Sequence, residues 1–266
     1  MFAAAGLEPP TRWDELIEVA KQLTDAEQGT YGFVATGGER WVWLYEHMGM
    51  YSVANGLAFV NPEGTECVFD QDSNWETLQF WVDMVNAGVL SLDDLMATDQ
   101  DARYISFANN KAAMFLGGHW ARDTLSRDFE MERPDDYGVV NLEGKVGIGS
   151  STGGWILTIT KDAQHPEEAF QYMQYAIDIP ENLIRLTTIM PSTPAANAIA
   201  LQDEFYDPFK ELIATNAYHP ITLNPGLPEQ AEILRNVSQA AMLGQMTVEE
   251  AAASFCEQIE GTLFEP

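Results

Sequence analysis

The sequence is poor in the side chains that most often bind metals or carry redox chemistry. It has 2 cysteines and 4 histidines in 266 residues, and no pair of histidines has the spacing typical of a zinc site. We therefore expect no metal centre and no cofactor. Cys67 and Cys256 lie far apart, so the sequence leaves open whether they form a disulfide or whether Cys256 is a small buried thiol on a helix.

Basic residues are also scarce. The chain has 13 lysines and arginines against 41 acidic residues, a formal net charge of −28. A field of this sign repels nucleic acid and anionic lipid, so we exclude both as partners. Bound calcium, life at high salt and simple solubility would each account for the acidity, and the sequence does not choose among them.

Long apolar runs are absent. No segment reaches the roughly 18 apolar residues that a membrane-spanning helix needs. The first residues contain neither a basic region followed by an apolar run of signal length nor a lipidation cysteine. An apolar content of 46% excludes a disordered chain, and the length suffices for one large core or two lobes.

One stretch, residues 151–177, carries an unusually clear pattern. Gly153 and Gly154 permit backbone angles that other residues avoid, and alternating apolar residues then predict a strand over 155–160. Pro166 begins a predicted helix over 166–177. Trp155, at the strand start just after a glycine turn, is placed either to line a cleft or to fill the core.

Periodicity and capping residues predict a helix-rich chain with several short strands. We predict strands at 31–35, 112–116, 137–140 and 155–160, and helices at 11–23, 39–50, 74–87, 166–177, 181–188, 195–200, 204–214, 228–243 and 247–262.

Several segments, taken in order, resemble one family. The Gly154-Trp155 strand followed by His165-Pro166-Glu167-x-Ala169 is similar to extracellular solute-binding proteins of ABC importers, in the sugar-binding branch that includes maltose-binding proteins. Three further segments resemble the same family: FAAAGLEPPTRWDEL at 2–16, FANNKAAMFLGGHW at 107–120 and TVEEAAASFCEQI at 247–259. Asn110 stands where the family usually has glycine.

The resemblance implies an α/β fold of the periplasmic-binding-protein type II, with two lobes and a hinge. It also implies an export signal and about half of one lobe before residues 2–16, so we expect an incomplete N-terminal lobe. Residues 1–105 would form the first part of the larger helical lobe, and 106–165 the crossover strands with a remnant of the N-terminal-type lobe. Residues 166–266 would return through the larger lobe.

The implied function is capture of a sugar or oligosaccharide in an interlobe cleft and its delivery to the permease subunits of an ABC transporter. We expect a monomer in the periplasm or at the cell surface, with membrane contact only through the transporter or a lipid anchor.

Aromatic rings and short polar groups are the natural carbohydrate ligands, because a pyranose has an apolar C–H face and a rim of hydroxyls. At about 100° per residue, Trp41 and Tyr45 share one helix face and Trp43 points away. These rings would either pack the larger lobe's core or contact sugar, and we favour Trp41 and Tyr45 as ligands. The full set of candidate ligand residues is Arg40, Trp41, Tyr45, Glu46, Trp120, Gly153, Gly154, Trp155, Ser192 and Tyr218.

The alternative is a carbohydrate-active or ester hydrolase that uses Ser151. Residues 149–153 fit the G-x-S-x-G pattern of a nucleophile elbow. That elbow requires a helix directly after the serine, whereas the sequence predicts a strand. We therefore expect a binding protein and not an enzyme.

Overall fold

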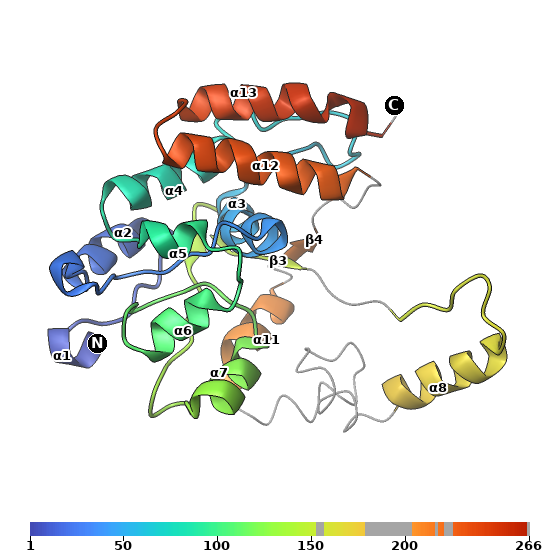
Figure 1. Ribbon diagram of the computed structural model, residues 1–266, viewed down its shortest axis with the longest axis horizontal. Coiled ribbons are helices and arrows are strands. Elements are labelled where there is room, and N and C mark those ends of the chain that lie inside the picture. The colour runs from blue at the N-terminus through green and yellow to red at the C-terminus, as the bar shows by residue number, and fades with distance from the viewer. Residues whose placement is uncertain (153–156, 179–203, 216–217, 221–225, 265–266) are drawn as a thin grey trace. The chain divides into compact units, whose positions relative to one another are not determined.

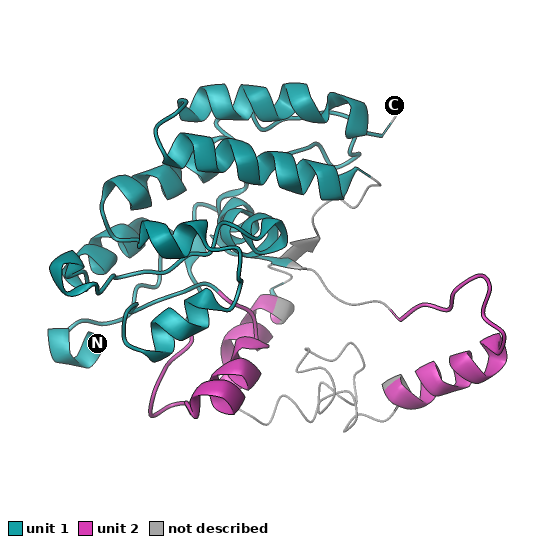
Figure 2. Ribbon diagram, viewed as in Figure 1, with its two compact units in different colours: residues 1–116, 140–152, 215–266 teal, residues 117–139, 153–214 magenta. Residues whose placement is uncertain are grey.

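The computed structural model describes residues 1–152, 157–178, 204–215, 218–220 and 226–264 (Figure 1). The chain divides into two compact units (Figure 2). Unit 1 comprises Met1–Leu116, Val140–Thr152 and Thr215–Pro266, and unit 2 comprises Gly117–Val139 and Gly153–Ala214. Unit 1 is therefore assembled from three separate stretches of the chain.

Helices dominate the described part of both units. Those of unit 1 are α1 (Phe2–Ala5), α2 (Trp13–Gln22), η1 (Ala26–Gln28), the π-helix η2 (Val42–Gly49), α3 (Met50–Asn55), α4 (Glu76–Asn86), α5 (Leu92–Met96), α6 (Ala102–Ala108), α12 (Leu227–Met242), α13 (Val248–Ile259) and η4 (Glu260–Thr262). Those of unit 2 are α7 (Ala121–Phe129), α8 (Pro166–Asp178), η3 (Glu204–Tyr206) and α11 (Asp207–Ala214).

The C-terminal helices α12 and α13 run side by side (Figure 1). A capping box begins α13, in which Thr247 accepts the Glu250 N–H and Glu250 accepts the Thr247 N–H. Apolar residues on one face of each helix are fully buried, among them Leu234 of α12 and Phe255 of α13. Burial of these amphipathic faces holds the pair against the rest of the unit 1 core.

Strand structure in unit 1 is sparse. β1 (Glu143–Gly144) pairs antiparallel with β2 (Gly147–Ile148), and β3 (Ser150–Thr152) pairs parallel with β4 (Tyr218–Pro220). The predicted strands at 31–35 and 112–116 lie beside each other through single parallel bridges, Tyr31 to Ala112 and Val34 to Phe115. These segments place extended backbone next to the helical core.

Most predicted helices are confirmed, but some details are wrong. Arg12 and not Thr11 occupies the N-cap of α2, and residues 39–50 include a π-helix. The described residues 137–140 and 157–160 form no strand. Their apolar alternation favours extended backbone but supplies no hydrogen-bonding partner, which a strand requires. The predicted helices at 181–188 and 195–200 lie outside the described residues.

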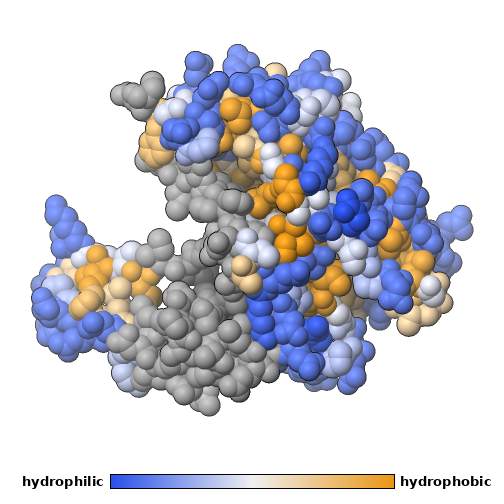
Figure 3. Space-filling model, turned by 180° about the vertical axis from the view of Figure 1, so that it is seen from behind, coloured by the Kyte–Doolittle hydropathy of each residue, from blue (hydrophilic) through white to orange (hydrophobic). Residues whose placement is uncertain are grey.

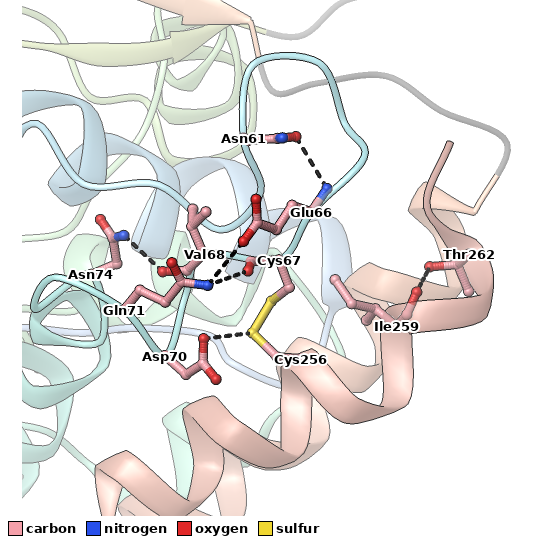
Figure 4. The surroundings of a disulfide bond; sticks show 10 residues. All are labelled: Asn61, Glu66, Cys67, Val68, Asp70, Gln71, Asn74, Cys256, Ile259 and Thr262. Carbon is pink, nitrogen blue, oxygen red and sulfur yellow. Dashed lines mark hydrogen bonds between the residues drawn. A yellow bond between two sulfur atoms is a disulfide. The ribbon is translucent and has the colours of Figure 1, made fainter. Parts of the chain in front are cut away.

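A disulfide joins Cys67 to Cys256, which are 189 residues apart in the sequence (Figure 4). Of the two alternatives that the sequence left open, the disulfide is therefore the one that the structure contains, and Cys256 is not a free thiol. Side-chain hydrogen bonds shape the loop that carries Cys67: Asn61 accepts the N–H groups of Thr65 and Glu66, and Gln71 donates to the Cys67 carbonyl. The loop is thereby preshaped to meet α13.

The visible surface is largely hydrophilic (Figure 3), as the excess of acidic residues requires. In the described part of the chain, no helix combines the length and the apolar character needed to cross a bilayer.

Candidate functional site

The site residues predicted on one helix are brought together at the start of η2. Glu39 caps the helical turn that begins at Arg40 and continues into η2, because its Oε2 accepts the N–H groups of Trp41 and Val42, both at 2.8 Å. These donors have no partner within the helix. The cap fixes the point at which the aromatic segment begins.

Trp41 and Tyr45 form a pair of half-buried rings. Their centroids are 6.0 Å apart and their planes meet at 32°. Trp43, in contrast, is completely buried and packs against His47 and Trp81. The prediction that Trp41 and Tyr45 share one helix face while Trp43 points away is confirmed, and their role as sugar ligands stays a prediction. Partial burial raises the pKa of Tyr45, so its hydroxyl is neutral and can both donate and accept.

Arg40 links the Trp41 ring to a charged side chain of α12. The Arg40 guanidinium lies 5.2 Å from the centroid of the Trp41 ring and 3.9 Å from Glu232. Glu232 also pairs with Arg235, and hydrogen bonding to Arg235 lowers the pKa of the Glu232 carboxyl. Within the described residues, Arg40 Nε has no acceptor. A chain of charged groups, Arg40, Glu232 and Arg235, therefore begins over the Trp41 ring and continues along α12.

Ser151 supports the same helix from β3. Its hydroxyl donates to the backbone carbonyl of Tyr45. A Cβ placed on Gly49 would lie 3.1 Å from the Ser151 Cβ, so the glycine permits this close approach. Among the described residues, Ser151 has no hydrogen bond to a histidine, and no described helix begins between Ser151 and the start of α8 at Pro166. The arrangement lacks the parts of a nucleophile elbow and serves to hold the helix.

Glu46 lies on the inner side of the helix, away from solvent. Its two carboxylate oxygens accept from Arg103 of α6 at 2.6 and 3.1 Å. Arg103 is 1% exposed and Glu46 7%. Burial raises the pKa of Glu46, and the charge of Arg103 partly offsets that effect. The structure therefore places Glu46 in a buried ion pair with Arg103.

The other candidates lie on other elements or outside the described residues. Trp120 belongs to unit 2, where its ring lies against Gly118 and 39% of the residue is exposed. Tyr218 lies in β4, and its backbone pairs with that of Ser150. Gly153, Gly154, Trp155 and Ser192 lie outside the described residues.

Sequence reasoning missed the residues that support the rings. Glu39 had a detectable signal, since an acidic residue after Gly37-Gly38 and before an apolar helix is typical of a cap. Arg103 had none, because only tertiary packing brings α6 to Glu46. In the described residues, no cluster of histidine, cysteine or carboxylate side chains is arranged to hold a metal ion.

The fold is that of type II periplasmic sugar-binding proteins. The chain is similar to a solute-binding protein of Thermotoga lettingae bound with α-D-tagatose, with a TM-score of 0.80 and 22% identity over 98% of this chain and 67% of that one. It is also similar to the GacH receptor of Streptomyces glaucescens, solved unliganded and with acarbose (TM-score 0.82, 18% identity, 98% and 66% covered). Maltose-bound MalE3 of T. maritima gives a TM-score of 0.80 at 23% identity, with 98% and 68% covered.

Comparisons of sequence agree. The chain is 23% identical to the multiple sugar-binding protein of Streptococcus mutans over 184 residues. This match covers 65% of the present chain and 42% of the S. mutans protein. The family model described as bacterial extracellular solute-binding protein matches residues 1–179. This family comprises transport binding proteins and not enzymes, so the hydrolase alternative is wrong. The chain belongs to the bacterial extracellular solute-binding protein family.

Proposed function

We propose that this chain binds a sugar or oligosaccharide and delivers it to the permease of an ABC importer. The observation that carries the proposal is the half-buried Trp41–Tyr45 pair with Arg40 beside it. Two tilted rings offer apolar area to the C–H face of a pyranose, and the Arg40 guanidinium offers donors to its hydroxyls.

Family membership supports the same conclusion. The relatives named above include proteins bound with tagatose, maltose or acarbose. The match spans 42% of the length of the curated relative. The properties of that whole protein are therefore only proposed for this chain: the choice of sugar, binding in an interlobe cleft and transfer to a permease. We also propose that the protein acts as a monomer at the cell surface. The Cys67–Cys256 disulfide supports an oxidising compartment.

Isothermal titration of the purified chain with maltose, α-D-tagatose and acarbose tests the proposal. We expect saturable binding of at least one of these sugars. Trp41→Ala and Tyr45→Ala should each weaken it about 30-fold, the effect of losing a contact worth about 2 kcal/mol. Tyr172→Ala is the matched control, because Tyr172 is an aromatic residue of α8 that is 69% exposed and lies in unit 2.

Two results would refute the assignment. The first is a folded wild-type chain that binds none of the three sugars or other common mono- and disaccharides. The second is binding that Tyr172→Ala reduces as much as Trp41→Ala does. Delivery is tested separately, by uptake of the labelled sugar in cells that lack the gene and in cells that carry it.

A further inference from the structure

The buried ion pair between Arg103 and Glu46 stands out because stability alone does not explain it. Both side chains are almost completely removed from water. Taking two charges into a protein interior costs several kcal/mol per ion, which their attraction often fails to recover. Well-packed apolar residues at such positions are often as stabilising or more so. The pair therefore calls for a role other than holding the core together.

Its position indicates that role. Glu46 follows Tyr45 directly and lies inside η2. A π-helix is rare, is seldom longer than one turn and is frequent at functional sites. An eight-residue π segment therefore needs support from outside its own backbone. Arg103 supplies that support through Glu46, at the residue next to the outer ring.

Arg103 is itself held firmly. Its Nη2 donates to the Tyr104 hydroxyl at 3.0 Å, and its guanidinium lies 4.8 Å from the Tyr104 ring centroid. The Tyr104 ring in turn packs edge-on against Phe115 at 5.4 Å. Because the guanidinium donates to both oxygens of Glu46, it fixes the orientation of this carboxylate as well as its distance from Arg103.

The helix is also fixed on its inner side. His47 Nδ1 donates to the Val42 carbonyl five residues earlier, at 3.2 Å, and the His47 ring packs against both Trp43 and Trp81, which also contact each other. Ser151 holds the Tyr45 carbonyl from β3. Arg103 thus completes a set of contacts that determines the rotation of η2 about its axis.

We propose that Arg103, acting through Glu46, is a positioning residue for the Trp41–Tyr45 ring pair. The inference rests on the proposed function insofar as this pair contacts sugar. Rotation of this helix would turn both rings and the Tyr45 hydroxyl together relative to the rest of unit 1, so affinity depends on the ion pair although neither charge touches the ligand.

The double variant Arg103→Met/Glu46→Leu separates positioning from stability. It removes both charges, so no unpaired charge stays buried, and we expect the melting temperature to be unchanged or higher. Affinity for the sugar that the wild type binds most tightly among maltose, tagatose and acarbose should fall at least tenfold. Arg103→Lys keeps both charges of the pair but loses the two parallel hydrogen bonds to the Glu46 oxygens, and it should give an intermediate loss. Arg12→Met, which removes two exposed ion pairs of unit 1, with Asp14 and with Glu143, should change affinity less than twofold.

A second readout needs no ligand. The near-ultraviolet circular dichroism contributed by Trp41 is obtained by subtracting the spectrum of Trp41→Phe from that of the parent. We expect this difference to be large in the wild type and strongly reduced in the double variant. If the double variant does not fold, Arg103→Lys is measured in the same way.

The outcomes are distinct. Affinity within threefold of the wild type in the double variant, or in Arg103→Lys if that variant replaces it, overturns the inference and leaves the proposed function intact. A wild type that binds no sugar overturns the proposed function. In that case the Trp41 difference spectrum decides the inference, and an unchanged spectrum overturns it.

Discussion

Gly32 lies so close to Ala20 of α2 that a Cβ on Gly32 would be 2.1 Å from the Ala20 carbonyl oxygen. The neighbouring atom belongs to the backbone of a helix, so it cannot move aside as a flexible side chain would. Only glycine lets the segment at 31–35 pass at this distance.

Gly32→Ala should therefore destabilise the protein by about 3 kcal/mol, at the upper end of the range for overpacking. Urea unfolding followed by circular dichroism measures the change. Gly261→Ala is the matched control, because nothing lies within 4 Å of a Cβ at that position, and its effect should stay within about 0.5 kcal/mol. Equal midpoints for the two variants would contradict the close approach.

Loss of the disulfide should also lower the free energy of unfolding. The bond closes a loop of 189 residues, and removing a native disulfide costs about 2–5 kcal/mol. Cys67→Ser/Cys256→Ser should show this loss in urea. The wild type treated with a reducing agent should unfold at the same urea concentration as the double variant. If reduction left the wild-type midpoint unchanged, the bond would not form in solution.

The start of α13 offers a smaller test. Thr247 accepts the Glu250 N–H at 3.1 Å and completes a capping box. Thr247→Ala should cost about 1 kcal/mol. Glu257→Gln, an exposed position on the same helix, should change stability by less than about 0.5 kcal/mol. Similar losses in both variants would show that the cap adds nothing specific.

Stability should depend on pH through His47. Burial, with the nearby charge of Arg103, lowers the pKa of His47 to about 3 in the folded protein, against about 6.5 in an unfolded chain. Below pH 6.5 the unfolded chain binds a proton that the folded chain does not. The free energy of unfolding therefore decreases as the pH is lowered from about 6.5 to about 3, by up to about 1.4 kcal/mol per pH unit.

His47→Gln should reduce that slope, as measured by urea unfolding at pH 6.5, 5.5 and 4.5. Met48→Leu changes a neighbouring buried residue that does not titrate, so its slope should match the wild type. A His47→Gln variant with the wild-type slope would show that the imidazole does not cause the dependence.

The common face of Trp41 and Tyr45 could be predicted from the sequence for a simple reason. Trp41 and Tyr45 are four residues apart, which is close to one turn in an α-helix or a π-helix, so both share a face in either case. The π-helix itself could not be predicted, because no residue pattern marks it. The ends of α13 could be predicted from Thr247 and Glu250, which cap it through contacts local in sequence.

Long-range partners were beyond sequence reasoning. The Cys67–Cys256 disulfide and the Glu46–Arg103 ion pair form only when segments that are distant in the sequence pack together. The predicted strand at 137–140 and the described part of the predicted strand at 155–160, residues 157–160, are absent for a related reason. Alternation records a preference for extended backbone and not the presence of a neighbouring strand. For Trp155 the sequence prediction stands alone, since the described residues do not include it.

The three-part assembly of unit 1 has a consequence for the order in which the protein can mature. Gln239 of α12 donates to the carbonyl of Gly37, just before the cap of η2, and Glu232 lies beside Arg40. These partners leave the ribosome about 200 residues after the helix they support. The nascent chain must therefore carry its aromatic helix without these partners until synthesis is almost complete.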